Sequence, residues 1–414
     1  MKKETIALVL LGCAKNAVDL QVMAGNLIKG GCTLSSDPDR ADTVIVNTCS
    51  FIASARAEAE AEIVRALELK RRGRYGRVVV TGCYPQRYPR LKDAFPGVDE
   101  WIGVPQTWVE PKLPGLRLTG KAFAYLKIAE GCAHRCAYCA IPSIRGKYRS
   151  RPFRSILREA RALVSSGCRE LNVVAQDPML WREDVKVKGE RRMLHLPDLL
   201  WAIDRIKGDF WVRVLYSYPS EITDDFLIWM LTSKHAVRYM DVPIQHTVPA
   251  VLERMNRKRA IEPSRSAADA LREVVPGITL RTTIMTGFPG ESEARFRELM
   301  ADLKRMQFDH LGAFAYSPEE GTKGAALAGR PRRAVAEARE RLVMEQQKRI
   351  WTLKARRMIG QEFVALVVAP GVARMESQAP DVDGVVYVDC DEVGEFVKVR
   401  LERAKGFDFI GIVV

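Results

Sequence analysis

Three cysteines lie close together in the segment EGCAHRCAYCAIP, residues 130–142. Cys132, Cys136 and Cys139 have the spacing C-x₃-C-x₂-C, and thiolates are the ligands that soft metals and iron–sulfur clusters prefer. A structural zinc ion and a four-iron cluster each require four ligands. Either a fourth ligand comes from elsewhere in the chain, or one metal position is left open.

An open metal position would give this loop a particular chemistry. Three cysteines can hold three irons of a 4Fe–4S cube, and the fourth iron can then bind a molecule that chelates through nitrogen and oxygen. The amino acid end of S-adenosylmethionine can do this, and an electron from the cluster can cleave its C–S bond to give a carbon radical. His134 stands too close to its neighbours for a standard zinc finger, and no paired C-x₂-C follows. A non-catalytic RNA-binding protein with structural zinc is the alternative from another class.

A second set of cysteines follows three similar apolar runs. TIALVLLGC, DTVIVNTC and RVVVTGC end in Cys13, Cys49 and Cys83, and the first two run into helical patterns. Apolar strands that alternate with helices predict a doubly wound parallel sheet. Ligands bind at the carboxyl ends of such strands, so we expect the three cysteines to gather at one edge. Three small buried residues are the alternative interpretation.

The remaining elements predict two further parts. Residues 109–121 are rich in Pro and Gly and predict a linker. From Ala122 onward, about six strand–helix units predict a partial (β/α)6 barrel, whose active site lies at the carboxyl ends of its strands. The segment VKVKGERR, residues 185–192, reads as a surface loop, and residues 328–358 as a basic helix. Short alternating runs after residue 358 predict a small closed β-barrel of OB-like type.

Charge is distributed unevenly along the chain. The net charge is +14, but residues 358–414 contain five basic and ten acidic residues, which gives them −5 and leaves +19 for residues 1–357. Binding of RNA phosphates requires basic surfaces, so the acidic tail argues against phosphate contact by the small barrel. An acidic surface suits a partner rich in lysine and arginine. The segment 328–358 has ten Lys or Arg against three Glu and is a candidate RNA contact.

The sequence also bears on the compartment. No run of eighteen apolar residues is present, so no membrane span is predicted. The first apolar run, Ile6–Leu11, is shorter than the core of a secretory signal. Nine cysteines without such a signal favour a reducing compartment, in which clustered cysteines bind metal or do redox chemistry. We therefore expect a cytoplasmic protein.

Several motifs resemble one known family. GCAHRCAYCAIPSIRGKYRSRP resembles the radical S-adenosylmethionine loop of the methylthiotransferases, LGCAKNAVDLQVM and VNTCSFI resemble their N-terminal domain, and RTTIMTGFPGE a barrel strand that helps seat the cofactor. The end of the chain is similar to a TRAM domain. CAKN, CSFI, LGAFAYSPEEGT and APDVDGVVYV resemble the RimO-type branch, which modifies a small-subunit ribosomal protein. The MiaB branch, which acts on adenosine in transfer RNA, is the near alternative.

The resemblance implies a domain order and two clusters. The implied parts are a methylthiotransferase domain at 1–112, a radical S-adenosylmethionine domain at 120–327, a basic linker helix at 328–358 and a TRAM domain at 359–414. Cys132, Cys136 and Cys139 would hold the radical 4Fe–4S cluster, and Cys13, Cys49 and Cys83 an auxiliary one. A methylated sulfur would leave the auxiliary cluster, the 5′-deoxyadenosyl radical would remove hydrogen from the β-carbon of an aspartate, and an electron donor would be required.

The resemblance also implies cofactor contacts. Tyr138 would lie near the adenine, and Gln176 and Asp177 near the methionine part of S-adenosylmethionine. Gly287 and Gly290 would allow close backbone approach, with an ordinary tight turn as the alternative. The chain departs from the RimO-type pattern in AQDPMLWRED, and MNRK at 255–258 is as similar to the transfer-RNA branch. These departures leave the substrate loop open between the two branches.

Overall fold

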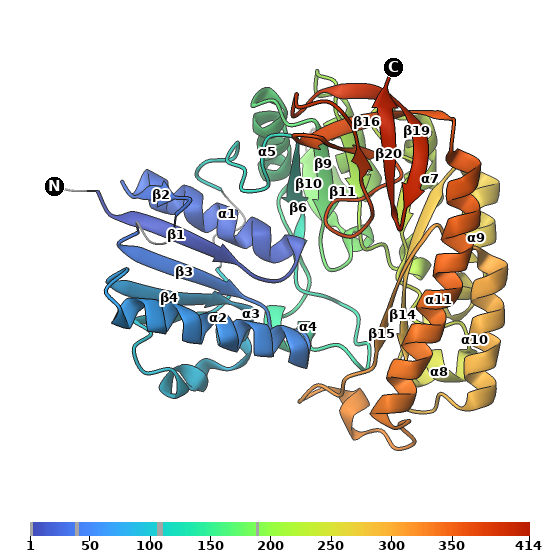
Figure 1. Cartoon of the computed structure of the whole chain (residues 1–414), viewed down its shortest axis with the longest axis horizontal. Coiled ribbons are helices and arrows are strands. Elements are labelled where there is room, and N and C mark those ends of the chain that lie inside the picture. The colour runs from blue at the N-terminus through green and yellow to red at the C-terminus, as the bar shows by residue number, and fades with distance from the viewer. Residues whose placement is uncertain (1–2, 38–40, 106–110, 188–189) are drawn as a thin grey trace.

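The computed structural model of this chain describes residues 3–37, 41–105, 111–187 and 190–414. Figure 1 shows a parallel sheet with its helices at the N-terminal end, a larger α/β part in the middle of the chain, and a small barrel at the C-terminal end. Part of the predicted linker at 109–121 lies outside the described residues.

The N-terminal part is a parallel sheet with helices on both faces. Its elements are β1 (Thr5–Leu10), α1 (Ala14–Lys29), β2 (Thr33–Ser35), β3 (Thr43–Thr48), α2 (Ala53–Arg71), β4 (Arg77–Gly82), α3 (Cys83–Arg87) and β5 (Glu100–Ile102), with strand order β2-β1-β3-β4-β5. Ile45 of β3 packs with Leu20 of α1, whereas its neighbours Val44 and Val46 pack with Ile63 of α2. Burial on both faces is why the strand is continuously apolar. The predicted doubly wound sheet is confirmed.

Six parallel strands of the middle part form an open barrel. They are β6 (Phe123–Lys127), β9 (Glu170–Val174), β12 (Trp211–Val214), β13 (Tyr239–Asp241), β14 (Thr279–Thr286) and β15 (His310–Ala315). They pair as β12-β9-β6 and β13-β14-β15. The Val212 N–H donates to His235 O at 2.7 Å and the Val237 N–H donates to Val212 O at 3.2 Å, so hydrogen bonds also join the two sheets. The predicted partial (β/α)6 barrel is confirmed.

Helices cover the outside of this barrel, and the N-terminal part covers its inner face. The outer helices are α5 (Phe153–Ser165), α6 (Leu196–Asp204), α7 (Asp224–Thr232), α9 (Ile261–Val274) and α10 (Glu293–Met306). The short helices α4 (Ile141–Arg145), which contacts α3 of the N-terminal part, and α8 (Pro249–Arg254) follow the carboxyl ends of strands, and β7 (Ala129–Glu130) pairs with β8 (Arg149–Ser150). Leu126 of β6 packs with Ile156 of α5. Its neighbour Tyr125 points the other way and packs with Val18 of α1. The first helix of the chain therefore lies against the concave side of the open barrel.

The C-terminal part is the predicted closed barrel. It contains β16 (Glu362–Ala369), β17 (Val372–Met375), β18 (Val386–Tyr387), β19 (Phe396–Lys405) and β20 (Asp408–Val413), closed in the order β16-β17-β18-β20-β19. The segment between β17 and β18 reaches into the open barrel of the middle part. Asp381 accepts a hydrogen bond from the Tyr125 hydroxyl at 2.5 Å, and Asp383 accepts one from the Tyr239 hydroxyl at 2.7 Å. These contacts dock the small barrel onto the middle part.

The long helix α11 (Arg333–Met358) connects the middle part to the small barrel. The prediction of one helix over 328–358 was wrong at its start, because Pro331 disfavours a helical conformation in the residue before it. Arg339 is buried and forms an ion pair with Glu291 at 2.7 Å, whereas Arg341 and Lys348 face solvent. Among the described helices, none combines the length and the apolar character that crossing a membrane requires.

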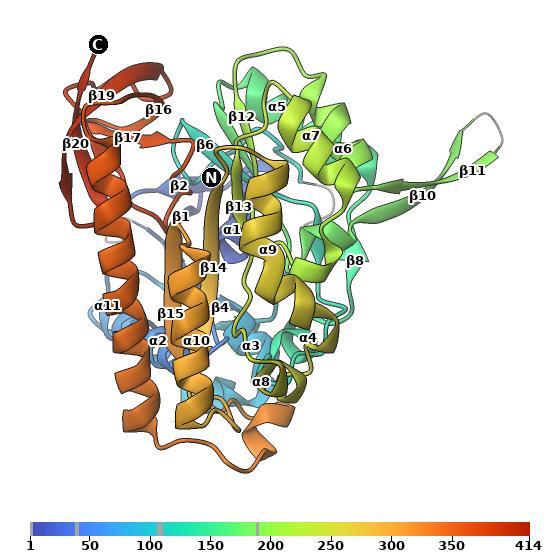
Figure 2. The same cartoon turned by 90° about the vertical axis from the view of Figure 1, so that its right-hand side faces the viewer.

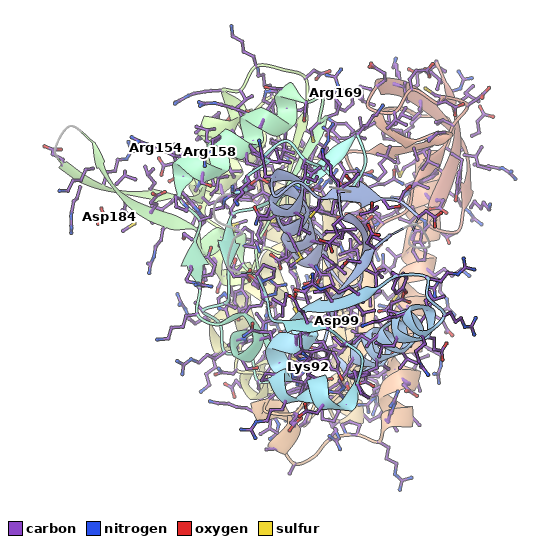
Figure 3. The ribbon with its side chains drawn as sticks, turned by 90° about the vertical axis from the view of Figure 1, so that its left-hand side faces the viewer. Lys92, Asp99, Arg154, Arg158, Arg169 and Asp184 are labelled. Atoms are coloured by element: carbon purple, nitrogen blue, oxygen red, sulfur yellow. The ribbon has the colours of Figure 1, made fainter. Side chains whose placement is uncertain are left out.

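The predicted surface loop at 185–192 is instead part of a β-hairpin. Strands β10 (Arg182–Val187) and β11 (Glu190–His195) pair antiparallel, with Arg182 opposite His195. Figures 2 and 3 show this hairpin extending away from the rest of the molecule, with Asp184 on it. The loop prediction was wrong because it relied on polarity. Cross-strand hydrogen bonds form a hairpin without an apolar face, and most of these side chains are exposed.

Candidate active site

The first group of cysteines lies at the carboxyl edge of the N-terminal sheet. Cys13 caps the start of α1 just after β1, Cys49 directly follows β3, and Cys83 is the first residue of α3 after β4. These three strands are neighbours in the sheet. A Cβ at Gly12 would lie 2.8 Å from Cys49 Cβ, so the loops of Cys13 and Cys49 pack directly against each other. The topology thus brings the three cysteines to one edge, as the strand pattern predicted.

Two side chains connect the cysteines of this edge. Asn16 Nδ2 donates to the Thr48 carbonyl at 3.0 Å, and Asn16 Oδ1 lies 3.6 Å from Cys83 Sγ. Arg145 comes from α4 in the middle part of the chain. Its Nη2 donates to Asn16 Oδ1 at 2.6 Å and lies 3.4 Å from Cys83 Sγ. A guanidinium group of the middle part therefore reaches the cysteine edge of the N-terminal sheet.

Burial and nearby cations act in opposite directions on these thiols. Burial raises the pKa of Cys83 to about 12 despite the opposing charge of Arg145. Burial also raises the pKa of Cys49. Cys13 is exposed, and the charges of Lys15 and Arg145 hold its pKa below its ordinary value. Because the thiolate is the form that binds metal, these cations favour the ligand form of Cys13.

The second group, Cys132, Cys136 and Cys139, lies on the loop after β7, and all three are partly exposed. The Cys132 N–H donates to the Gly146 carbonyl at 3.2 Å, which holds the loop against the end of α4. A Cβ at Gly131, whose φ is +75°, would lie 2.2 Å from the Lys147 carbonyl oxygen, so only glycine fits there. The loop follows the first barrel strand, where sites of such folds form.

Tyr138 and the positive charge of Arg257 accompany this second group. Arg257 Nη1 lies 3.8 Å from Cys136 Sγ and 3.3 Å from the Tyr138 hydroxyl. The Tyr138 ring packs edge-on against Phe288, with the ring centres 6.3 Å apart. Burial raises the pKa of Cys139 to about 12, and Arg257 opposes this effect. A guanidinium group beside the loop offsets negative charge that thiolates would carry.

Gln176 and Asp177 follow β9 and differ in whether their side chains have a hydrogen-bonding atom without a partner. Gln176 Nε2 donates to Glu130 Oε1 at 3.1 Å, while its Oε1 is buried without a hydrogen-bond partner among the described residues. The Asp177 carboxylate accepts the Met179 N–H at 3.1 Å and lies 2.6 Å from His134 Nε2. Gln176 therefore keeps an acceptor that a ligand can use, whereas protein groups already engage Asp177.

The two glycines of the GFPGE segment have protein neighbours that exclude a side chain. Gly287 has a φ of +73°, and a Cβ there would lie 2.2 Å from Ala336 Cβ of α11. Gly290 has a φ of +94°, and its Cβ would lie 2.6 Å from Arg254 Cδ. Positive φ values and close neighbours, Ala336 of α11 at Gly287 and Arg254 of α8 at Gly290, leave no room for a side chain at either position.

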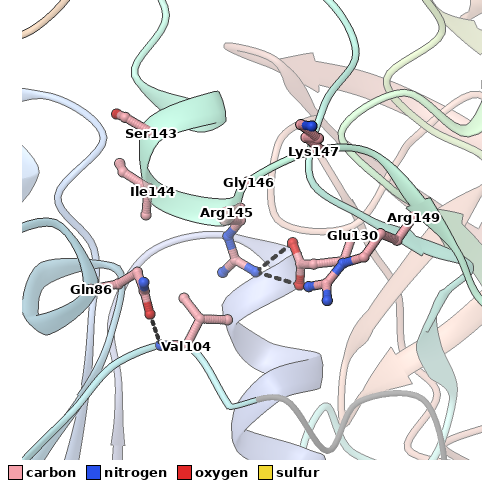
Figure 4. A pocket seen from close by; sticks show the side chains of 9 residues that line it. All are labelled: Gln86, Val104, Glu130, Ser143, Ile144, Arg145, Gly146, Lys147 and Arg149. Carbon is pink, nitrogen blue, oxygen red and sulfur yellow. Dashed lines mark hydrogen bonds and ion pairs between the residues drawn. The ribbon is translucent and has the colours of Figure 1, made fainter.

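A buried network of charges between the two cysteine groups was missed from the sequence. Lys127 pairs with Asp19 and, at 2.8 Å, with Glu130. Arg145 Nη1 lies 3.0 Å from Asp19 and 2.9 Å from Glu130. Figure 4 shows the Arg145 and Glu130 side chains facing each other. The network joins α1 of the N-terminal part to the strand and helix that flank the Cys132 loop. Charged residues at otherwise apolar strand and helix positions were the available signal.

Replacing Arg145 by methionine tests how much this network contributes to the stability of the protein. We expect the free energy of unfolding to fall by about 3–5 kcal/mol, because two buried carboxylates would lose one of their cations. Lys147→Met is the matched control, since Lys147 is exposed two residues further along the chain and a surface change of this kind costs at most about 0.5 kcal/mol. Urea denaturation measures both. Equal stability of the two variants would contradict the assignment.

The residues present fit iron–sulfur clusters. Among the described residues, no three His, Cys, Asp or Glu side chains converge on one ion position. In a four-iron cluster each thiolate binds a different iron, so such convergence is not required. The donors are soft thiolates with Arg145 or Arg257 beside them. A pocket of about 420 Å³ lies next to the charge network, lined by Gln86, Val104, Glu130, Ser143, Ile144, Arg145, Gly146, Lys147 and Arg149 (Figure 4).

Comparison with known families agrees with this arrangement. The Radical SAM superfamily matches residues 126–303, the TRAM domain matches 359–414, and the family described as Uncharacterized protein family UPF0004 matches 5–103. Among solved structures, the radical S-adenosylmethionine methyltransferase TsrM from Kitasatospora setae aligns with a TM-score of 0.54 over 78% of this chain and 77% of its own, at 16% identity. At that identity the likeness shows the fold alone. The fold and the site define a radical S-adenosylmethionine enzyme.

Curated relatives match nearly the whole chain. A protein of Moorella thermoacetica is 41% identical over 98% of both chains, and one of Desulfitobacterium hafniense is 38% identical over 99% of this chain and 98% of its own. Both are named ribosomal protein uS12 methylthiotransferase RimO. The chain belongs to this RimO family, and it is a radical S-adenosylmethionine methylthiotransferase.

Proposed function

We propose that this enzyme methylthiolates the β-carbon of an aspartate in ribosomal protein uS12, using S-adenosylmethionine and a sulfur source. One observation carries the proposal: two groups of three cysteines lie at the carboxyl edges of two parallel sheets, on either side of the Arg145 network. Attachment of sulfur to an unactivated carbon requires one group that generates a radical and another that provides sulfur. The names of the relatives support uS12 as the substrate.

In this proposal each cysteine group holds one 4Fe–4S cluster. Cys132, Cys136 and Cys139 hold the radical-generating cluster, and Cys13, Cys49 and Cys83 hold the auxiliary one. When bound, the first cluster and S-adenosylmethionine supply a carbon radical, and the auxiliary cluster supplies the methylated sulfur.

The side chains around the clusters bind and orient the cofactor. Gln176 Oε1 is a buried acceptor available to the amino acid end of S-adenosylmethionine, and Tyr138 provides an aromatic face next to Cys139. Asp177 orients His134 through their 2.6 Å contact. Gly287 and Gly290, which have no side chain, allow close approach of their backbone to the cofactor.

The chain divides into four functional parts. We assign a methylthiotransferase domain to 1–112, a radical S-adenosylmethionine domain to 120–327, a basic linker to 328–358 and a TRAM domain to 359–414. The family matches at 5–103, 126–303 and 359–414 support these limits.

The partner surfaces are opposite in charge. Residues 358–414, which include the small barrel, carry a net charge of −5. This charge suits the basic surface of a ribosomal protein, alone or in the assembled small subunit. On α11, exposed basic residues remain after the ion pairs are counted, and this face is proposed to contact ribosomal RNA. They are Arg341, Lys348, Arg349, Arg356 and Arg357. A separate electron donor reduces the clusters, and a ribosomal substrate places the reaction in the cytoplasm.

Mass spectrometry separates this function from the transfer-RNA alternative. In a strain that lacks the gene, we expect the uS12 mass to fall by the difference between a methylthio group and the hydrogen that it replaces. Methylthiolated nucleosides in digested transfer RNA should remain at their normal level. Restoration of the wild-type gene should return the uS12 mass. A strain that loses only a nucleoside modification, with uS12 unchanged, would show that the substrate is transfer RNA.

A further inference from the structure

Lys15 extends from the first cysteine group toward the open barrel. It lies two residues after Cys13, in the first turn of α1. Its Nζ lies 3.5 Å from the centre of the Tyr216 ring. Tyr216 follows the carboxyl end of β12 and has a φ of +72°. The ammonium group of Lys15 therefore lies at the end of the barrel where active sites of such folds form.

The second cysteine group approaches the same segment from its own side. The His134 ring stacks on Tyr218 with the ring centres 3.8 Å apart, and the Arg257 guanidinium lies 4.2 Å from the same ring. Tyr216 and Tyr218 are two residues apart, so their Cα atoms are separated by at most about 7 Å. The segment 216–218 is thus contacted from both cysteine groups, by Lys15 at Tyr216 and by His134 at Tyr218. A carbon that loses hydrogen at one group and receives sulfur from the other has to lie near both.

Other cations of this region are already engaged by protein groups. Arg145 and Lys127 pair with Asp19 and Glu130. Arg257 donates to the Pro243 carbonyl at 2.8 Å.

Lys15 differs, because no carboxylate of the described residues lies within 4.0 Å of its Nζ. Asp241 accepts the Tyr216 N–H at 3.3 Å and lies 3.8 Å from Arg281. Asp241 and Cys13 are near enough for their charges to act on Lys15, but neither forms an ion pair with it among the described residues. An ammonium that rests on an aromatic face keeps donors for a further acceptor. Lys15 therefore has unused capacity to bind an anion.

We propose that Lys15 binds the side-chain carboxylate of the aspartate that the enzyme modifies. The inference rests on the function proposed above. It identifies the enzyme group that distinguishes the acidic side chain of an aspartate from the uncharged base of an adenosine. A lysine ammonium forms a charge-assisted hydrogen bond with a carboxylate. A site built around such a donor rejects an acceptor that lacks the charge. The same contact places the β-carbon, which is bonded to that carboxylate, between the two cysteine groups.

The test compares two forms of uS12 on the reconstituted full-length enzyme. One has the target aspartate and the other has asparagine in its place, and fluorescence anisotropy measures the binding of each. We expect the wild-type enzyme to prefer the aspartate form by about 10- to 100-fold. Lys15→Met should abolish this preference by weakening binding of the aspartate form only. Lys147→Met, which removes an exposed charge from the neighbouring pocket, should keep it.

Each outcome decides one of the two proposals. If wild-type enzyme modifies uS12 and Lys15→Met still prefers the aspartate form, the role of Lys15 is wrong and the function stands. If wild-type enzyme fails to modify uS12, the proposed function is wrong. Iron and sulfide content shows whether Lys15→Met keeps its clusters. If Lys15→Met loses its clusters, Lys15→Arg is tested in its place. An arginine variant that retains the positive charge but shows no preference for the aspartate form overturns the proposal.

Discussion

Cys132→Ala should abolish cleavage of S-adenosylmethionine and formation of the methylthio product. Cys132 is one of three thiols on the loop after the first barrel strand, and the proposed cluster would have only two protein ligands left. Loss of an outer-shell partner of a metal ligand already costs about 10- to 100-fold, so we expect activity below about one hundredth of the wild-type rate. Anaerobic assays of 5′-deoxyadenosine measure cleavage.

Iron content gives this prediction a second readout. We expect the reconstituted wild-type chain to hold about eight irons and eight sulfides, and Cys132→Ala about four of each. Cys390→Ala is the matched control, since Cys390 lies in the small barrel and its thiol contacts Glu392. It should keep the full iron content. Wild-type protein with one or two zinc ions and no sulfide would support a zinc-containing binding protein instead.

Cys13→Ala should separate the two halves of the reaction. Cys13 lies at the edge of the N-terminal sheet, on a different element from the Cys132 loop. We therefore expect 5′-deoxyadenosine to form at a rate within about threefold of wild type, and the methylthio product to fall below about one hundredth. Both quantities come from one reaction mixture by mass spectrometry of the small molecules and of uS12.

A matched variant isolates the role of this cysteine. Cys32→Ala changes another cysteine of the N-terminal part, which is partly exposed, directly precedes β2 and packs with the Leu20 cluster away from the carboxyl edge. It should retain both activities. If Cys13→Ala forms the methylthio product at the wild-type rate, the auxiliary cluster has been assigned to the wrong residues.

Predictions that depend on neighbouring residues in the chain agreed with the structure. The apolar runs before Cys13, Cys49 and Cys83 became parallel strands, because burial on both faces requires continuous apolar sequence. The alternating runs of the last residues became a closed barrel. The helix at 328–358 was wrong only at its first turn, where Pro331 intervenes. The hairpin at β10 and β11 was missed, since its strands have no apolar face.

Predictions about single contacts were less complete. Close backbone approach at Gly287 and Gly290 was predicted from the sequence and stays a prediction. The sequence did not indicate that Ala336 and Arg254, which belong to other elements, would leave no room for a side chain there. Asp177 is predicted to lie beside the cofactor, and the sequence did not indicate that its carboxylate contacts His134. No local pattern shows which partner a polar side chain will meet after folding.

The sequence by itself determined most of the elements, their order and the two sets of thiols, because spacing, apolar periodicity and turn residues act between neighbours in the chain. Only the tertiary structure decided how the two sets are placed relative to each other. Arg145 meets Asp19 from 126 positions away in the chain, and Lys15 meets Tyr216 across the same junction. Such contacts arise when separately folded parts pack together. Packing depends on the shape and charge of whole surfaces, which no short stretch of sequence contains.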